Sequence, residues 1–369
     1  MKVTLISTQL GMGGAENLVC NLADQFAARG HGVQLISLLG EPVVLPQDTS
    51  IRVHNLRIDK RKPVTWFAGL AYFIAAIRAF QPDVVHAHSF HSIMLARLLR
   101  PLLRYPKLIS TGHHQREGEG FEGLLYRLTD KLSDIMTTIS DSTTSAVLQR
   151  TGLALHRVIT VSNGIDAELF QFSKKSRWEL RRINGLHEDD RVLVAIGRLS
   201  QEKDFPNLLH ALKEVENRGA LGHNLFLLIV GTGPQEIRQQ LEGLVRELDL
   251  RTKVIFLGVR RDIPALLSAA DIFVLSSAWE GFGLVVAEAM ACERVVVATD
   301  SGGVREVIGD AGFLCPPQDS AALGSAIQAA LALSEEERQL LGKQARARIV
   351  EHYSLDSAAE RWLTLYRTL

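Results

Sequence analysis

The fold is decided by the segment IFVLSSAWEGFGLVVAE, residues 272–288, in which a short apolar run leads into a glycine turn and then into an apolar helix start. Four consecutive apolar residues without alternation are typical of a strand that is buried on both faces of a parallel sheet. The same order of apolar run, turn and amphipathic stretch recurs along nearly the whole sequence. We therefore expect an α/β protein built from repeated strand-helix units.

Thirteen apolar runs have strand length and define this repeat. In the first half they are residues 3–7, 33–38, 51–56, 84–87, 107–110, 135–139 and 158–161, and in the second half 192–196, 225–230, 254–257, 272–275, 295–298 and 312–315. Each half alone would make a doubly wound sheet.

The length of 369 residues exceeds one ordinary core, because a domain holds roughly 150 residues. Two domains with a cleft between them are therefore expected. Turn chemistry in SNGID, residues 162–166, and the charged stretch 173–191 that precedes the next predicted strand place the boundary near residue 165.

Charge is balanced overall but not along the chain. Lys and Arg number 41, as do Asp and Glu, which argues against a dedicated nucleic-acid binder. Residues 1–165 hold 17 basic and 12 acidic residues, whereas the remainder holds 24 and 29. A domain of net charge +5 and one of −5 are expected to attract different partners.

The three cysteines are too few and too scattered for a disulfide framework or a Cys-rich zinc site, so a reducing, cytoplasmic location is expected. Met1-Lys2 leads directly into an apolar run of strand length, and we expect no secretory signal there.

Residues 64–80 form the one long apolar stretch. Between Thr65 and Arg78 lie 12 wholly apolar residues, fewer than the roughly 20 that span a bilayer. A buried core helix is therefore favoured. The preceding Lys60-Arg61-Lys62 leaves contact with anionic lipid headgroups open as an alternative to a simply solvated run.

The motif GMGGAE, residues 11–16, follows the first predicted strand and opens a helix, where backbone N–H groups can approach a phosphate. A nicotinamide enzyme would need G-x-G-x-x-G and an acidic residue about 20 positions further on. Position 16 is Glu and the second strand ends without a carboxylate, so the dehydrogenase interpretation fails.

Histidines gather at the ends of two neighbouring predicted strands: His86, His88, His91, His113 and His114. The spacing of His86 and His88 puts both side chains on one side of a strand, so a metal site has to be considered. No carboxylate or cysteine completes a ligand set, and hydrogen bonding to the backbone is the favoured alternative.

Arg198 and Lys203 flank the turn after the predicted strand 192–196. Two cations at this spacing can neutralise a diphosphate, Arg by a planar fork and Lys as a point charge, although two solvated charges would look the same. The next turn, Gly231-Thr232-Gly233-Pro234, either lets a ligand approach closely or only closes the turn.

Glu280 and Glu288 bracket the glycine turn of the opening segment. Glu288 is expected about two turns into the helix, where it can accept hydrogen bonds from a ribose, while Glu280 at the strand end can hold a sugar hydroxyl. Amides of the turn can cap a phosphate. Ordinary helix-capping roles would explain each glutamate alone but not the whole set.

Taken together, these segments resemble the retaining, nucleotide-sugar-dependent glycosyltransferases of family 4, which have the two-domain GT-B architecture. The resemblance spans nearly the full chain and rests on Gly13-Gly14-Ala15-Glu16, Thr111-Gly112-His113, Asn163-Gly164-Ile165-Asp166, Gly197-Arg198-Leu199 with Glu202-Lys203, Gly231-Thr232-Gly233-Pro234, Phe256-Leu257-Gly258, and Glu280 with Glu288. It implies two Rossmann-like doubly wound domains facing a central cleft: an acceptor domain, residues 1–165, and a donor domain, residues 166–352. A final helix, residues 353–369, would cross back to the first domain.

The resemblance also implies roles for individual residues. Arg198 and Lys203 would hold the donor diphosphate and act in catalysis together with Glu280, which would fix hydroxyls of the transferred sugar. His113 would face that sugar from the first domain. The remaining donor contacts would come from Gly13, Gly14, Gly231, Val259, Arg260, Gly281, Phe282, Gly283, Leu284 and Glu288, with Val259 and Arg260 at the base and Glu288 at the ribose.

The implied reaction moves a hexosyl or N-acetylhexosaminyl group from a nucleoside diphosphate sugar, with a UDP-sugar favoured, to a saccharide or lipid-linked acceptor of cell-surface polysaccharide, lipopolysaccharide or glycolipid. No nucleic-acid partner is implied. The sequence contains no D-x-D triplet, which fits a transferase that needs neither a divalent metal nor another cofactor.

The excess positive charge of the first domain suggests an anionic acceptor, or peripheral contact with the inner face of the cytoplasmic membrane. A GT-B epimerase or phosphorylase, or a non-catalytic nucleotide-sugar-binding protein, are the alternatives.

The chain departs from the family pattern in two places. Glu293-Arg294-Val295 stands where members commonly have Gly at the first position and Pro at the third, so a differently shaped turn is expected there. His114-Gln115-Arg116 replaces a glycine or asparagine after His113, which leaves the acceptor side unassigned.

Overall fold

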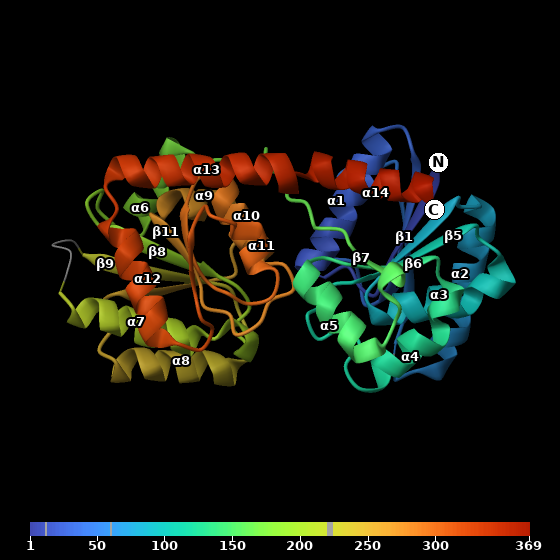
Figure 1. Cartoon of the computed structure of the whole chain (residues 1–369), viewed down its shortest axis with the longest axis horizontal. Helices are drawn as coiled ribbons and strands as arrows, with labels where there is room; N and C mark the ends of the chain where they lie inside the picture. The colour runs from blue at the N-terminus through green and yellow to red at the C-terminus, as the bar shows by residue number, and fades with distance from the viewer. Residues whose placement is uncertain (12, 60, 220–223) are drawn as a thin grey trace. The chain divides into compact units, whose positions relative to one another are not determined.

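The computed structural model of the chain describes residues 1–11, 13–59, 61–219 and 224–369, so Met12 and Lys60 of the sequence motifs lie outside the described residues. The chain divides into two compact units (Figure 1). Unit 1 comprises residues 1–164 and 355–369, and unit 2 comprises residues 165–354. The division after Gly164 lies one residue before the predicted boundary, and the return to unit 1 at Leu355 lies two residues after the predicted one.

Unit 1 contains a parallel sheet with the order β3-β2-β1-β4-β5-β6-β7 across its described residues. Its strands are β1 (Lys2–Ser7), β2 (Gly32–Leu39), β3 (Arg52–Ile58), β4 (Val84–His88), β5 (Lys107–Gly112), β6 (Ile135–Thr138) and β7 (Val158–Thr160). Its helices are α1 (Gly14–Ala28), α2 (Pro63–Phe80), α3 (Phe90–Leu103), α4 (Phe121–Thr129), α5 (Asp141–Thr151) and α14 (Leu355–Thr368), with 3₁₀ turns at Asp130–Leu132 and Leu155–Arg157.

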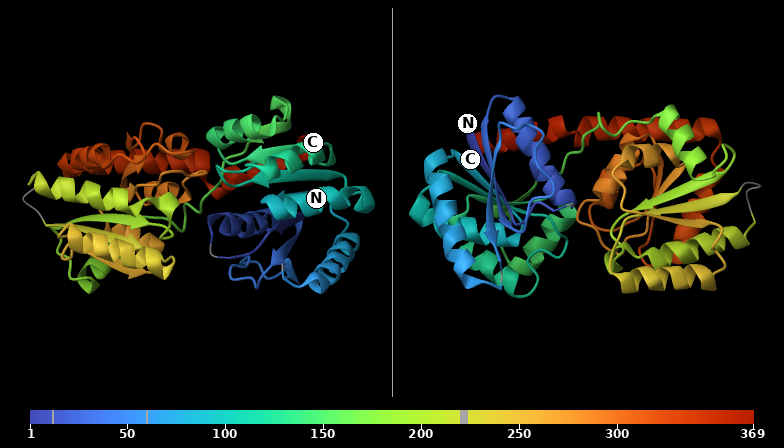
Figure 2. Two further views of the ribbon diagram at one scale, coloured as in Figure 1. Left: turned by 90° about the horizontal axis from the view of Figure 1, so that it is seen from below. Right: turned by 180° about the vertical axis from the view of Figure 1, so that it is seen from behind.

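Helices cover both faces of this sheet (Figure 2). On one face α1 and α14 bury Phe26, Trp362 and Tyr366 against β1 and β2. On the other face α2 and α3 bury Phe73 and Ile93. Since α14 comes from the end of the chain, the core of unit 1 is built from two segments that are distant in sequence.

Unit 2 repeats the plan with the parallel order β10-β9-β8-β11-β12-β13 in its described part. Its strands are β8 (Arg191–Ile196), β9 (Leu225–Val230), β10 (Val254–Gly258), β11 (Ile272–Leu275), β12 (Val295–Thr299) and β13 (Phe313–Cys315). Its helices are α6 (Lys174–Ile183), α7 (Phe205–Asn217), α8 (Gln235–Glu247), α9 (Ile263–Ala269), α10 (Leu284–Ala291), α11 (Val304–Ile308), α12 (Ser320–Ala332) and α13 (Glu335–Tyr353), with a 3₁₀ turn at Gln201–Lys203.

The predicted doubly wound α/β class is confirmed. Each predicted strand is present, with its ends shifted by no more than two residues. Every residue of β11 and β12 is buried, as their unbroken apolar runs indicated.

The prediction of a buried core helix over residues 64–80 is wrong. Helix α2 forms there, but its buried residues are Gly69, Phe73, Ala76 and Ile77, a narrow stripe that packs on the sheet. Leu70, Ile74 and Phe80 are half-buried. The other large apolar side chains, Val64, Trp66, Phe67 and Tyr72, are exposed, Phe67 by 76%. Within the described residues, α2 is the helix whose length and apolar composition would suffice to cross a membrane.

The turn after α10 also differs from expectation. Glu293 has a φ of +59° and lies directly after the C-cap residue Cys292, the position at which glycine usually closes a helix. The turn therefore takes the left-handed form without a glycine, at a cost of roughly 1 kcal/mol.

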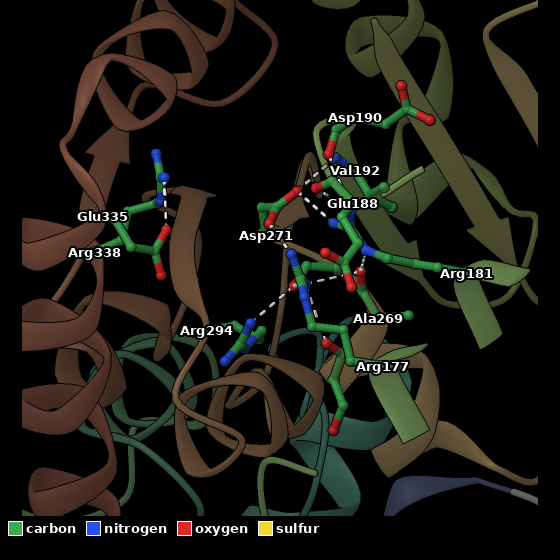
Figure 3. Close-up of polar contacts among 12 residues, drawn as sticks. Arg177, Arg181, Glu188, Asp190, Val192, Ala269, Asp271, Arg294, Glu335 and Arg338 are labelled. Atoms are coloured by element: carbon green, nitrogen blue, oxygen red, sulfur yellow. Dashed lines mark hydrogen bonds and ion pairs between the residues drawn. The ribbon is translucent and has the colours of Figure 1, made fainter. Parts of the chain in front are cut away.

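A buried carboxylate fastens the amino ends of β8 and β11 (Figure 3). Asp271 accepts hydrogen bonds from Arg177 at 2.6 Å, from Arg181 at 2.8 Å and from the backbone N–H of Val192 at 2.8 Å. Burial opposes ionisation, but the two guanidinium groups outweigh it and hold the pKa of Asp271 below its usual value. Helix α6 is thereby tied to two central strands of the sheet.

Replacing Asp271 with Asn should lower the free energy of unfolding by about 3 kcal/mol, because the buried Arg181 and the half-buried Arg177 lose their counter-charge. Urea denaturation measures the change. Glu242→Gln breaks an exposed pair with Arg238 and should cost less than about 1 kcal/mol. Equal effects of the two substitutions would contradict a central role for Asp271.

Candidate functional site

The strand order of unit 2 reverses between β8 and β11, and ligands of open α/β sheets bind at the carboxyl ends of the strands at such a switch point. The loop after β8 carries Arg198 and Lys203, and the loop after β11 carries Glu280. The predicted catalytic residues of unit 2 thus come from the two strands that flank the switch point.

Lys203 and Glu280 form an ion pair across this point. Lys203 Nζ donates to Glu280 Oε1 at 2.5 Å, and Ser277 Oγ donates to the same oxygen at 2.6 Å. Ser276 Oγ donates to the backbone carbonyl of Lys203 at 2.8 Å. The side chains of Lys203 and Glu280 are only 18% and 12% exposed. Glu280 Oε1 is therefore committed, whereas Oε2 accepts no hydrogen bond within the described part of the chain.

Arg198 lies on the same loop but is free to move toward a ligand, since its side chain is 70% exposed. It donates to Glu202 Oε1 at 2.5 Å, and the carbonyl of Glu202 accepts from the N–H of Ala278 at 2.8 Å. That backbone bond joins the β8 loop to the β11 loop. Together, Arg198 and Lys203 place two cations at one edge of the sheet.

Two glycines allow these loops to approach each other. Gly231 has a φ of +137°, and a Cβ atom there would lie 1.9 Å from the carbonyl oxygen of Gly197. Gly302 has a φ of +59°, and its Cβ would lie 1.7 Å from the carbonyl oxygen of Glu280. Gly302 was not among the predicted site residues, although its position in a glycine pair after β12 repeats the turn pattern of the other loops.

Glu288 is nearer to the helix start than predicted. Helix α10 begins at Leu284, after Gly283, so Glu288 lies little more than one turn inside it. Its carboxylate is half-buried and accepts no hydrogen bond from the described residues, and burial raises its pKa to about 8. At neutral pH this group is a protonated carboxyl, which can accept a hydrogen bond from a ligand hydroxyl and donate one to it.

The turn that precedes α10 presents backbone amides. Gly283 is the N-cap residue with a φ of +88°, and the first N–H groups of a helix have no acceptor within it. Phe282 fixes the turn that runs from Gly281 to Leu284, because its buried ring packs on Tyr353 with the ring centroids 5.5 Å apart. The backbone amides at this helix start can donate hydrogen bonds to a negatively charged oxygen.

Val259 and Arg260 follow β10, further along the same edge of the sheet. Val259 is 53% exposed. The guanidinium of Arg260 is held by Asp262, with Nε 2.8 Å from Oδ1. This contact restrains the arginine side chain. The backbone of the loop is then the part that can contact a planar base, as predicted for Val259 and Arg260.

The glutamate of the glycine motif in unit 1, Glu16, occupies part of the space beside the glycines. Gly13 is the N-cap residue of α1 and Gly14 its first residue. A Cβ on Gly13 would lie 2.2 Å from Glu16 Oε2, so this carboxylate lies over the helix N-terminus. An anion is thus already present where a phosphate contact was considered.

His113 belongs to a buried histidine cluster at the carboxyl ends of β4 and β5. Its Nε2 lies 2.9 Å from His88 Nδ1, and its Nδ1 is buried without a partner within the described residues. His86 bonds Tyr366 and Thr111, each at 2.6 Å. Burial lowers the pKa of His113 to about 3 and those of His86 and His88 well below their usual value, so all three are neutral.

No group of three potential metal ligands gathers anywhere in the described parts of the chain.

The predicted site residues form two sets, one in each unit. Arg198, Lys203, Glu280 and Glu288 lie along the carboxyl edge of the sheet in unit 2, whereas His113 and Gly13 lie at the carboxyl edge of the sheet in unit 1.

Comparison with known proteins covers both units. The family model "Glycosyltransferase Family 4" matches residues 12–169, and "Glycosyl transferases group 1" matches residues 176–348. The putative glycosyltransferase EpsD of Bacillus subtilis is 33% identical over 266 residues, which cover 68% of each chain. N-acetyl-alpha-D-glucosaminyl L-malate synthase of Bacillus anthracis is 27% identical over 380 residues, covering 96% of this chain and 94% of that protein.

Among solved structures, Anabaena HepE in complex with UDP and glucose superposes with a TM-score of 0.85 at 20% identity, and the match covers both chains completely. At this identity the likeness shows the fold, which is GT-B.

Replacing Glu288 with Gln should change how stability depends on pH. Because burial raises the folded-state pKa to about 8, the native protein binds more protons than the unfolded chain between about pH 4.5 and 8, and stability falls as pH rises through that range. Gln cannot ionise, so the free energy of unfolding of the variant should rise relative to that of the parent by about 1 kcal/mol for each pH unit in this range. Urea denaturation at pH 5, 6.5 and 8 tests this, and parallel pH profiles would contradict it. Glu242→Gln is the exposed control.

Proposed function

The chain belongs to the glycosyltransferases of family 4, and on that premise we propose that it transfers a sugar from a UDP-sugar to an acceptor hydroxyl with retention of configuration at the anomeric carbon. The observation that carries this proposal is the Lys203–Glu280 pair at the switch point of unit 2, with Arg198 beside it.

The two cations would stabilise the leaving group. As the bond between the anomeric carbon and the diphosphate oxygen breaks, negative charge grows on the diphosphate. Lys203 is already fixed by Glu280 and by the Ser276 bond to its carbonyl, so it needs little reorganisation. Preorganised charge of this kind usually contributes more to catalysis than any other effect. Arg198 would join it on substrate binding.

Glu280 would orient the transferred sugar. Its Oε1 is occupied by Lys203 and Ser277, while Oε2 remains available to accept hydrogen bonds from sugar hydroxyls. A carboxylate held in this way is poorly suited to attack carbon. We therefore propose that the acceptor oxygen attacks on the face from which the diphosphate departs, and that a leaving phosphate oxygen takes the acceptor's proton.

The nucleoside would lie along the rest of the edge. Glu288, partnerless and half-buried, would accept from the ribose hydroxyls, and the backbone at Val259 and Arg260 would meet the base. The amides of Gly283 and Leu284 would contact a phosphate. UDP is favoured because the HepE structure of the same fold was solved with UDP.

On the acceptor side we propose a saccharide or lipid-linked acceptor of cell-surface polysaccharide, lipopolysaccharide or glycolipid. The net charge of +5 on unit 1 supports an acceptor with an anionic group. A cytoplasmic location is supported by Cys20, Cys292 and Cys315, which are all unpaired and buried.

Lys203→Ala and Glu280→Gln should each lower kcat roughly 100- to 1,000-fold, because each removes one half of the preorganised pair. Sugar release from a panel of UDP-sugars measures the rate. Lys213→Ala, which opens a half-buried pair with Glu216 in the same unit, is the matched control and should keep full activity.

Each single variant leaves one buried charge unpaired, so thermal unfolding has to accompany the kinetics. The double variant Lys203→Met/Glu280→Gln should recover stability but not turnover. Near-native turnover in a folded single variant would overturn the site assignment.

UDP should raise the melting temperature in the presence of EDTA, because arginine and lysine, rather than a metal ion, are proposed to hold the diphosphate. A ligand at 100 times its Kd adds about 2.7 kcal/mol of stability. The shift should exceed those with GDP and ADP, and Glu288→Gln should reduce it. A shift that needs added Mg²⁺ would contradict the metal-independent proposal.

A further inference from the structure

Helices α2, α3 and α4 of unit 1 are neighbours on one side of its sheet (Figure 1). Each of them carries exposed apolar side chains. We call this surface the α2–α4 face. It consists of Val64 and Phe67 on α2, Leu98 and Leu102 on α3, and Phe121, Leu124 and Leu128 on α4. The seven side chains are between 49% and 79% exposed.

A helix on the surface of a protein in water normally carries charged residues on its outer side. Helix α2 contains no acidic residue, and Arg78 is its only charged one. Scattered apolar side chains would need no explanation, but gathered ones mark an interaction surface. We therefore expect the α2–α4 face to be covered by a binding partner.

The charge around this face indicates what that neighbour is. Residues 61–104, which contain α2 and α3, hold six basic residues and a single acidic one, Asp83. Unit 1 as a whole holds 19 basic and 14 acidic residues, so this segment accounts for its entire excess of +5. Arg61, Lys62, Arg78 and Arg104 are all exposed. Apolar side chains flanked by cations complement an anionic lipid surface.

The helices cannot leave unit 1 to cross a bilayer. Gly69, Phe73, Ala76 and Ile77 of α2 belong to the core, and a Cβ on Gly69 would lie 2.7 Å from Ile58. Helix α2 is thus held against the sheet along one stripe while its opposite side is exposed. A helix in this position can lie in the plane of the membrane interface but cannot span it.

We propose that the α2–α4 face is a membrane-docking surface that rests on the anionic leaflet of a lipid bilayer. Phe67 and Val64 enter the headgroup boundary, and Trp66, which is 46% exposed, lies at the interface, where tryptophan is favoured. Arg61, Lys62, Arg78 and Arg104 contact the lipid phosphates. This interaction does not depend on the proposed sugar transfer.

The face also adjoins the functional edge of unit 1. Helices α2, α3 and α4 each follow the carboxyl end of a strand, so their first turns lie at the sheet edge that carries Gly13 and His113. Docking on lipid would bring that edge to the membrane surface.

Co-sedimentation of the full chain with phosphatidylcholine vesicles that contain about one third phosphatidylglycerol tests the proposal. The protein should bind at low salt and bind severalfold less at high salt. Val64→Gln/Phe67→Gln should weaken binding at least about tenfold. The matched control Leu155→Gln/Leu340→Gln, which alters two leucines outside the face that are 75% and 60% exposed, should bind like the parent.

Fluorescence locates the contact. The chain has four tryptophans, and emission should shift to shorter wavelength on addition of the anionic vesicles. Trp66→Phe should remove that shift while retaining most of the binding.

Three results would overturn the proposal: no binding at low salt, equal binding of the Val64→Gln/Phe67→Gln variant and the parent, or a lipid-free dimer of the parent that this variant abolishes. The last would identify the face as an interface between two copies of the chain. Turnover on a water-soluble acceptor should be the same in parent and variant, so that failure here is distinguishable from failure of the proposed transferase activity.

Discussion

The Asp271 carboxylate holds the amino ends of β8 and β11 together, and the rest of unit 2 is organised around that contact. β11 has only four residues, so its far end lies roughly 13 Å away and has little freedom to shift against β8. At that far end the Lys203–Glu280 pair closes the same two strands. Fold stability and site geometry are thus properties of one pair of strands, fixed at one end by arginine and at the other by lysine.

Local sequence was enough to predict the strands and the turns in which the candidate site residues lie. Buried parallel strands read as unbroken apolar runs, and Arg198, Lys203 and Glu280 lie in the turns that follow two of them. The roles predicted for these residues came from the family resemblance. The Asp271 cluster was not predictable in this way, because Arg177 lies 94 residues from its partner and no short pattern joins them. Gly302 was missed for a related reason, since its role is set by the backbone of Glu280, which belongs to another loop.

Helix α2 shows the limit of composition as a guide. The sequence of an apolar helix of 18 residues has the same pattern whether the outer side of the helix packs in a protein core or contacts lipid. Only its place on the sheet, with Gly69 fitted against Ile58, shows that one stripe is buried and the remainder is not. The histidine cluster shows a similar limit, because spacing put His86 and His88 on one side of a strand but could not show that His113 would share a hydrogen bond with His88.

Unit 1 is made from the two ends of the chain, and this has a consequence for biosynthesis. Trp362 and Tyr366 of α14 fill its core beside Phe26, and the Tyr366 hydroxyl also bonds His86. A ribosome delivers these residues after unit 2, which is continuous in sequence, so the core of unit 1 stays incomplete until α14 has been synthesised. Until then the nascent amino-terminal half exposes the apolar surface that α14 later covers.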